Sequence, residues 1–164
     1  MNIRIATLND IDSIVDIYNQ AILAGKKTAD TTIFTSNERI EWFKSHTRDK
    51  YPLFVAVEQD EILGYLTISA YRSGRIALEK TAEVSYYVHF RHHKKGIGSV
   101  LLHHAISICP SLEIETLIAI LLECNINSIK LLEKNGFKQW GCMPKIAEIN
   151  GKFFDHLYYG CHLK

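Results

Sequence analysis

The stretch HHKKGIGSVLL, residues 92–102, combines residue types that can hold an anionic group. Two histidines and two lysines stand directly before Gly96 and Gly98, and the apolar residues that follow predict the start of a helix. Glycines let a backbone turn sharply and approach a ligand closely, and free N–H groups at a helix N-terminus attract negative charge. The pattern therefore predicts a pyrophosphate site; the alternative is that the glycines serve only a turn between a strand and a helix.

Two widespread phosphate-binding loops differ from this one. The dinucleotide fingerprint G-x-G-x-x-G requires a third glycine where Leu101 stands, and it belongs to an opening βαβ unit rather than late in a chain. The triphosphate loop G-x-x-x-x-G-K-[ST] is absent from the sequence. These differences disfavour a nicotinamide or flavin enzyme and a nucleotide triphosphatase.

The segment before the loop, TAEVSYYV at 81–88, predicts a strand with one polar face. With the two-residue period of a strand, Glu83, Ser85 and Tyr87 point to one side while the intervening apolar residues point to the other. An interior strand under helices has no reason to carry Glu on a covered face unless that face opens into a cleft, although an edge strand would also allow it. Glu83 is therefore the candidate catalytic carboxylate.

The remaining elements must position this strand and loop. Capping boxes at Thr7 to Asp10 and at Thr35 to Glu38 predict two early helix starts. We also expect the aromatic residues Trp140 and Phe137 to belong to the core. In chain order the patterns predict a strand at 3–6, two helices, a hairpin at 53–69, a strand at 81–88, a helix, a buried strand at 116–123, a helix from 127 closed at Gly136, and two final strands. This order predicts an α/β (α+β) fold, a mixed sheet covered by helices.

Length and composition limit the class of protein. The 164 residues, with 47% apolar and 23% charged, fit one domain spanning 1–164. The 19 Lys and Arg nearly balance the 18 Asp and Glu, so no overall charge attracts nucleic acid or a membrane surface. Four cysteines without a C-x-x-C pair and the lack of a signal-like or membrane-spanning segment predict a cytoplasmic location. The histidines lack zinc-type spacing, so we expect no metal.

Two segments carry a resemblance to a known family. VSYYVHFRHHKKGIGSVLL, followed about thirty residues later by NINSIKLLEKNGF, resembles the two acyl-CoA motifs of the GNAT N-acetyltransferase superfamily. Within it, IYNQAI, TADT, the Tyr71-Arg72 pair, KTAEVSYYV and GKFFDH resemble the branch of phosphinothricin and methionine sulfoximine acetyltransferases. The resemblance covers nearly the whole chain. It implies a GNAT-type, mostly antiparallel central sheet of about seven strands flanked by about four helices, acetyl-CoA as co-substrate, a small-molecule amine acceptor and a homodimer.

The resemblance also implies roles for individual residues. Backbone amides of the glycine loop would hold the CoA pyrophosphate, the strand before it would pair with the pantetheine arm through its main chain, and the second motif would reach the far side of that arm. The implied cofactor-binding residues are Tyr86, Tyr87, Val88, His93, Lys94, Lys95, Gly96, Ile97, Gly98, Ser99, Asn125 and Ser128. The implied substrate-binding residues are Arg72, Glu83, Val84 and Ser85.

Two positions depart from the family pattern. His93 stands where Arg or Gln is usual, which weakens a phosphate cradle whose donors are mainly backbone. Leu132 stands where Tyr or His is common, a residue often proposed to protonate the leaving thiolate. Leu has no proton to give, so no general acid is assigned at Leu132.

The chemistry follows from the protonation of the acceptor. An amine near neutral pH is mostly ammonium, so Glu83 is expected to remove a proton, directly or through water, before the amine attacks the thioester. A main-chain N–H near Val88 would stabilise the charge on the thioester oxygen. Arg72 would hold a carboxylate or phosphinate of the acceptor. Cys124 is the rival nucleophile, but we interpret it as a small apolar residue, which makes direct transfer the expected route.

Two other functions remain open at this stage. A protein N-terminus or lysine as acceptor calls for an open, acidic groove, and TADTT and GKKT offer no acidic cluster. A non-catalytic acyl-CoA-binding sensor would agree with Leu132 and His93. Glu83 argues against a sensor, because binding alone needs no carboxylate on the polar face of the strand.

Overall fold

The protein, described by a computed structural model over residues 1–163, contains the predicted succession of elements. The order is strand, helix, helix, three strands, helix, strand, helix and two strands, with short 3-10 turns between some of them. The elements are β1 (Asn2–Ile5), α1 (Ile11–Leu23), α2 (Ser36–Lys44), β2 (Leu53–Glu58), β3 (Glu61–Ala70), β4 (Thr81–Val88), α3 (Ile97–Ile108), β5 (Thr116–Leu122), α4 (Ile126–Lys134), β6 (Lys138–Ile149) and β7 (Lys152–His162).

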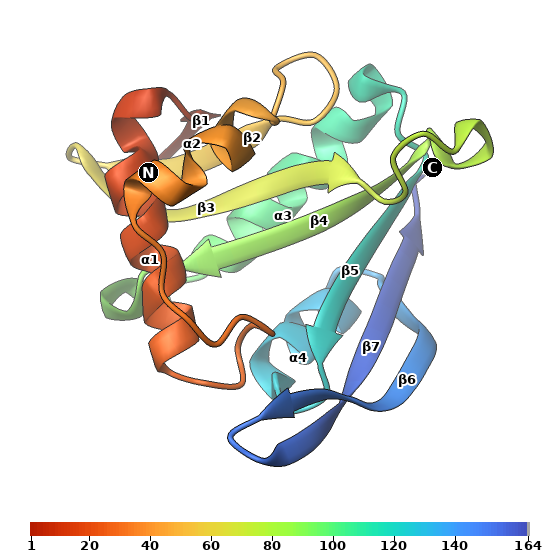
Figure 1. Cartoon of the computed structure of the whole chain (residues 1–164). Coiled ribbons are helices and arrows are strands. Elements are labelled where there is room, and N and C mark those ends of the chain that lie inside the picture. The colour runs from red at the N-terminus through yellow and green to blue at the C-terminus, as the bar shows by residue number, and fades with distance from the viewer. Residues whose placement is uncertain (164) are drawn as a thin grey trace.

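The strands form one seven-stranded sheet in the order β1-β2-β3-β4-β5-β7-β6. Every neighbouring pair is antiparallel except β4 and β5, which are parallel. Figure 1 shows α1 and α2 on one face of the sheet and α3 with α4 on the other. The prediction of a mixed, mostly antiparallel sheet flanked by four helices is confirmed.

Each face of the sheet has its own hydrophobic core. Ile14 and Ile17 of α1 pack with Val55 and Tyr65 on one face. On the other face a larger cluster joins α3 and α4 to the sheet, with Leu102 fully buried within it. Because both faces are covered by helices, a polar side chain on β4 can reach solvent only through a gap in this covering.

The first two helical segments begin at the predicted capping boxes. The carboxylate of Asp10 accepts a hydrogen bond of 2.7 Å from the Thr7 N–H and a bidentate pair of 2.7 and 2.8 Å from Arg4. The carboxylate of Glu38 accepts a 2.7 Å bond from the Thr35 N–H. Both boxes satisfy backbone donors that the helix itself leaves free.

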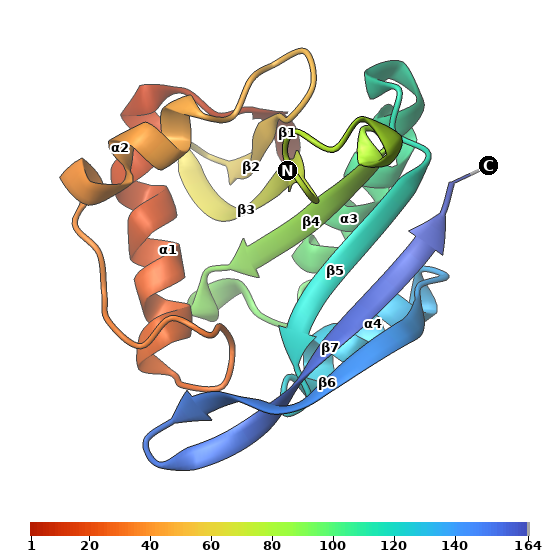
Figure 2. The ribbon, with the colours of Figure 1, turned by 45° about the vertical axis from the view of Figure 1, so that its right-hand side comes forward.

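The sheet separates into two parts between β4 and β5. The pairing of these strands covers only three residues on each, from Thr81 opposite Thr116 to Glu83 opposite Ile118. β4 continues alongside β3 as far as Val88, and β5 follows β7 instead. Figures 1 and 2 both show the two strands diverging beyond the paired residues. One edge of β4 therefore lacks a strand partner after Glu83.

Two local predictions need correction. Trp140 is not a core residue, since 46% of it is exposed, whereas Phe137 is buried at 2%. The inner face of the Trp140 ring covers Gly160 on β7, where an added Cβ would lie only 2.0 Å from the indole. Helix α4 begins at Ile126, one residue before the predicted start. Hydrophobicity alone could not predict that Trp140 lies over Gly160, because the contact depends on the pairing of β6 with β7.

Candidate active site

Two adjoining cavities open where β4 and β5 diverge. One, of about 420 Å³, lies between the end of β4, the glycine loop and the start of α4, and we call it the loop cavity. The other, of about 490 Å³, lies between β4, α1 and α2 and contains Glu83, and we call it the Glu83 cavity. Both cavities are lined by Lys27, Ser85, Tyr87, Ile120 and Leu121, so they meet at the middle of β4.

The loop cavity gathers nearly all the predicted cofactor residues. Lys95 is the exception: its ammonium lies 3.3 Å from Nδ1 of His92, and it does not line the cavity. The lining includes Tyr86, Tyr87, Val88, His93, Lys94, Gly96, Ile97, Gly98, Ser99, Asn125 and Ser128. Residues from β4, the glycine loop and α4 thus face one space, as the two sequence motifs predict.

The glycine loop presents backbone donors to this cavity. Lys94 and Gly96 have left-handed φ values of 63° and 80°, and α3 begins directly afterwards at Ile97. The first N–H groups of a helix have no acceptor within it, and here they lie at the cavity wall beside Lys94. Gly98 lets α3 approach α4 closely, since a Cβ there would lie 3.0 Å from Leu131. This donor set suits a phosphate group.

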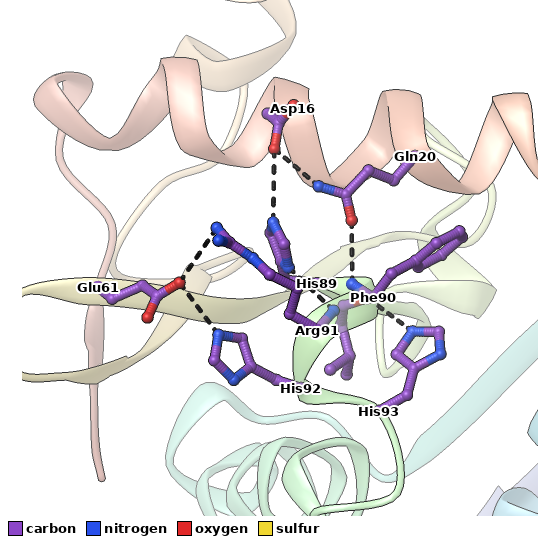
Figure 3. A network of polar contacts seen from close by, with 9 residues as sticks. Asp16, Gln20, Glu61, His89, Phe90, Arg91, His92 and His93 are labelled. Carbon is purple, nitrogen blue, oxygen red and sulfur yellow. Dashed lines mark hydrogen bonds and ion pairs between the residues drawn. The ribbon is translucent and has the colours of Figure 1, made fainter.

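Side chains from α1 and β3 hold the glycine loop in place, as Figure 3 shows. Gln20 of α1 accepts a 2.9 Å bond from the Phe90 N–H and donates a 2.8 Å bond to Asp16. Glu61, at the start of β3, lies 3.0 Å from Nε2 of His92, and this hydrogen bond lowers the pKa of Glu61. The loop is therefore fixed before a ligand arrives.

His93 takes part in the same framework rather than reaching freely into the cavity. Its Nε2 donates a 2.9 Å hydrogen bond to the carbonyl of Val88, which closes the start of the loop onto the end of β4. Only the other ring nitrogen remains available for a ligand. The substitution of His for the usual Arg or Gln thus contributes to loop geometry.

The strand pairing shows which residues of β4 direct their backbone N–H and C=O groups to its free edge. The N–H of His89 donates to Leu63 on β3, and backbone groups of alternate residues point to opposite edges of a strand. The main chain of Tyr87 therefore faces β3, opposite Tyr65, while Val84, Tyr86 and Val88 direct theirs toward the gap. The expected main-chain pairing thus belongs to Tyr86 and Val88, and Tyr87 contributes its side chain.

One buried group in the loop cavity lacks a hydrogen-bond partner. The Tyr86 hydroxyl has no partner in hydrogen-bond geometry among residues 1–163. Burial raises the pKa of Tyr86 to about 12, and the neighbouring Ser128 hydroxyl opposes part of that rise. Among residues 1–163, the Tyr86 hydroxyl oxygen is the sole buried side-chain nitrogen or oxygen atom without a hydrogen-bond partner. Buried polar groups are normally satisfied, so an orphan beside a cavity fits a bound ligand as its partner.

Glu83 is half-buried on the wall of the second cavity. Burial raises the pKa of its carboxyl group, and the nearby Ser85 hydroxyl has a smaller effect in the opposite direction. Within residues 1–163 no Lys, Arg or His forms an ion pair with it. A carboxylate that is desolvated and has no cationic partner is a stronger base than an exposed one.

An aromatic wall and the 25–35 segment complete the Glu83 cavity. Tyr87 stacks on Tyr65 with centroids 5.4 Å apart and meets the edge of Tyr18 at 4.9 Å. The Tyr18 hydroxyl bonds to Thr28, at 2.9 Å, and to Asp30. The TADT segment, singled out by the resemblance, thus closes over the cavity. Arg39 of α2 also lines it, and no motif or spacing in the sequence pointed to that residue.

Three other predicted positions lie elsewhere or supply no chemistry. Arg72 is exposed in the turn after β3, 5.8 Å from the Tyr71 ring, and lines neither cavity, so its contact with an acceptor stays a prediction. Leu132 lines the loop cavity and is 1% exposed, with no proton to donate. Cys124 lines neither cavity, and burial raises its pKa, which disfavours a reactive thiolate.

Other classes of site receive no support from the described residues. Among residues 1–163, no three His, Cys, Asp or Glu side chains gather as metal ligands. No helix in that range is long and apolar enough to cross a bilayer.

The sequence is similar to those of known proteins over almost its whole length. The family model described as an acetyltransferase (GNAT) domain matches residues 3–158. YwnH of Bacillus subtilis (strain 168), named as a candidate phosphinothricin acetyltransferase, is 41% identical over 156 residues, which are 94% of each chain. The L-methionine sulfoximine/L-methionine sulfone acetyltransferase of Salmonella typhimurium (strain LT2) is 31% identical over 94% of this chain and 90% of that one.

A solved structure agrees with these relatives. The GNAT superfamily phosphinothricin acetyltransferase from Sinorhizobium meliloti, in complex with acetyl-CoA, has a TM-score of 0.92 at 29% identity, over 99% of this chain and 88% of that one. The family match covers both cavity-forming segments, the glycine loop and the start of α4. The chain therefore belongs to the GNAT family of acetyltransferases.

Proposed function

We propose that this enzyme transfers an acetyl group from acetyl-CoA to the amine of a small, amino-acid-like acceptor such as phosphinothricin or methionine sulfoximine. One observation carries the proposal: a cavity built of backbone donors meets a cavity containing a basic carboxylate at the free edge of β4. The names of the relatives supply the class of acceptor.

The loop cavity is proposed to bind acetyl-CoA. The first N–H groups of α3 and Lys94 would hold the pyrophosphate, and the exposed main chain of Tyr86 and Val88 would hold the pantetheine arm as an added strand. Asn125 and Ser128 lie on the opposite wall, at the start of α4. When bound, acetyl-CoA supplies the activated acyl group.

The Glu83 cavity is proposed to bind the acceptor. The carboxylate of Glu83 accepts a proton from the ammonium group, directly or through water, which frees the nitrogen lone pair for attack. Ser85 lines both cavities, and Val84 beside it on β4 lines the loop cavity; the two residues would align the amine with the thioester. A main-chain N–H on the free edge of β4, near Val88, would stabilise the developing oxyanion.

The experiment is thiol release from acetyl-CoA with phosphinothricin, methionine sulfoximine, methionine sulfone and ordinary amino acids. Turnover of an acidic amine that falls by about 10²- to 10⁴-fold in Glu83→Gln supports the proposal. Cys124→Ala is the matched control and should keep full activity, since direct transfer needs no thiol. Acetyl-CoA binding without turnover of any amine would contradict the proposal and favour a protein acceptor or a sensor.

We also propose that the enzyme is cytoplasmic and forms a homodimer. All four cysteines are free, which is typical of a reducing compartment. β6, at the edge of the sheet, and its neighbour β7 expose Trp140, Met143, Ile146 and Phe153, and exposed apolar side chains suit a subunit contact. Sedimentation of wild type and Ile146→Glu tests the dimer, which the charged side chain should dissociate.

A further inference from the structure

Arg39 is a cation on the wall of the Glu83 cavity, where aromatic rings surround its guanidinium. Its guanidinium lies 3.9 Å from the centroid of the Trp42 ring, 5.0 Å from that of Phe34 and 5.3 Å from that of Tyr18. Among residues 1–163, no ion pair and no side-chain hydrogen bond involves Arg39. By contrast, Arg4 forms a bidentate pair with Asp10.

The aromatic surroundings fix the guanidinium without occupying its donors. An aromatic face attracts the flat face of a guanidinium, while the N–H groups point outward in its plane. Arginine keeps its charge at any physiological pH. A half-buried cation held in this way is ready to bind an anion in a bidentate manner, with little loss of side-chain freedom.

The other charged groups of the cavity leave this role to Arg39. The Asp30 carboxylate accepts a hydrogen bond from the Tyr18 hydroxyl, and Glu83 is the proposed base. Lys27 lines both cavities and so stands at the border with the loop cavity. His156 also lines the Glu83 cavity, and burial lowers its pKa, which favours the neutral imidazole. Among residues 1–163, the Glu83 cavity therefore offers one basic carboxylate and one guanidinium without a partner.

The aromatic wall separates these two groups. The ring centroid of Trp42, which lies under the guanidinium, is 6.4 Å from that of Tyr65. Tyr65 in turn stacks on Tyr87, which is four residues beyond Glu83 on β4. A cavity with an anion and a cation on separate parts of its wall is complementary to a molecule with an amine and an acidic group.

We propose that Arg39 binds the carboxylate or other acidic group of the acceptor while Glu83 faces its amine. This inference rests on the proposed function and adds the residue that determines substrate class. Arg72, the arginine expected for this role from the sequence, is exposed outside both cavities. Arg39 thus selects zwitterionic amino acids over simple amines.

The first test compares two acceptors, L-methionine sulfone and its methyl ester, in wild type and four variants. In Arg39→Ala the KM for the free acid should rise about 10- to 100-fold, as expected for loss of a charged hydrogen-bond pair. The KM for the ester and that for acetyl-CoA should stay within about twofold of wild type. Arg39→Lys should recover part of the loss, and Arg48→Ala, an exposed arginine outside both cavities, should change nothing.

The same panel can overturn the inference. An unchanged KM for the free acid in Arg39→Ala contradicts it, and so does an equal rise for acid and ester. A rise confined to Arg72→Ala would return the role to the residue expected from the sequence.

A second readout does not depend on turnover. The chain has two tryptophans, Trp42 and Trp140, so Trp140→Phe leaves Trp42, directly beneath Arg39, as the sole reporter. L-methionine sulfone should change the fluorescence of that variant, and the ester should not. The added Arg39→Ala change should abolish the response. If no amine is acetylated, the proposed function fails, but this fluorescence titration still decides whether Arg39 binds the free acid. An absent fluorescence response rejects the binding of the acid by Arg39.

Discussion

At the scale of single residues, the site places a carboxylate where folding does not favour one. Glu83 is half-buried, its pKa is raised by burial, and no cation pairs with it among residues 1–163. Burying an unpaired charge opposes folding, whereas the same desolvation makes the carboxylate a better base. The proposed catalytic role and the stability of the fold therefore make opposite demands on this position.

Glu83→Gln should consequently stabilise the protein while removing activity. Because the pKa of Glu83 is higher in the folded than in the unfolded chain, the folded state is penalised above the unfolded pKa, and the penalty disappears as the pH falls below it. We expect Tm of the variant to exceed that of wild type at pH 8, by about 2–4 °C for each kcal/mol recovered. The two should converge near pH 4. A lower Tm at pH 8 would show that Glu83 has a structural role.

Tyr86→Phe tests the orphaned hydroxyl. Removing a buried polar group that has no partner should leave the unliganded protein as stable as wild type, or up to about 1 kcal/mol more stable. If bound acetyl-CoA is the partner, its KM should rise about 2- to 10-fold. Thermal unfolding without ligand and steady-state kinetics measure both effects. A loss of stability with an unchanged KM would identify the hydroxyl as a structural group.

At the scale of elements, the glycine loop combines a left-handed turn with the start of α3. Gly96 has φ of 80° and open space around its Cα, so only backbone strain opposes a side chain there. Gly98 has ordinary dihedrals but little room beside Leu131. The two glycines therefore serve different purposes, conformation at one and close packing of α3 on α4 at the other.

Gly96→Ala should weaken acetyl-CoA binding through the conformation of the loop. A left-handed conformation costs a non-glycine residue about 1–2 kcal/mol, which the loop can relieve only by moving its N–H donors. Gly74, with φ of 75° and open space in the turn after β3, is a matched control outside both cavities. Both variants should lose similar stability, and only Gly96→Ala should raise the KM for acetyl-CoA. Equal KM values would contradict a binding role for the loop.

At the scale of the whole molecule, the sheet is divided into two parts that meet at three paired residues on each of β4 and β5. Strands β1 to β4 with α3 form one part, and β5 to β7 with α4 form the other, as Figure 2 shows. A ligand in the loop cavity contacts both parts and completes the open edge of β4. It should therefore stabilise the fold globally as well as locally.

Acetyl-CoA at about one hundred times its Kd should raise Tm by about 5–10 °C. Hydrogen exchange locates the effect: added protection is expected at Val84, Tyr86 and Val88 and in the first turn of α3. Strand β1, at the far edge of the sheet, serves as the internal control. Protection confined to β1 and β2, or absent from β4, would contradict binding along the β4 edge.

The sequence by itself determined the features that depend on local periodicity and chemistry. The alternation in TAEVSYYV identified the polar face of β4, and the spacing from Thr7 to Asp10 and from Thr35 to Glu38 identified two helix starts. The glycine loop was also recognisable, because its residue types restrict the backbone directly. Each of these signals lies within a few residues of the structure it predicts.

Only the tertiary structure decided which distant residues share a cavity. Arg39 and Glu83 come from α2 and β4, and no spacing in the sequence relates them. Likewise, Lys95 contacts His92 and does not line the loop cavity, the main chain of Tyr87 faces β3, and Trp140 covers Gly160 instead of entering the core. The physical reason is the same throughout: long-range strand pairing sets where β4 and β5 diverge, and that divergence creates the site.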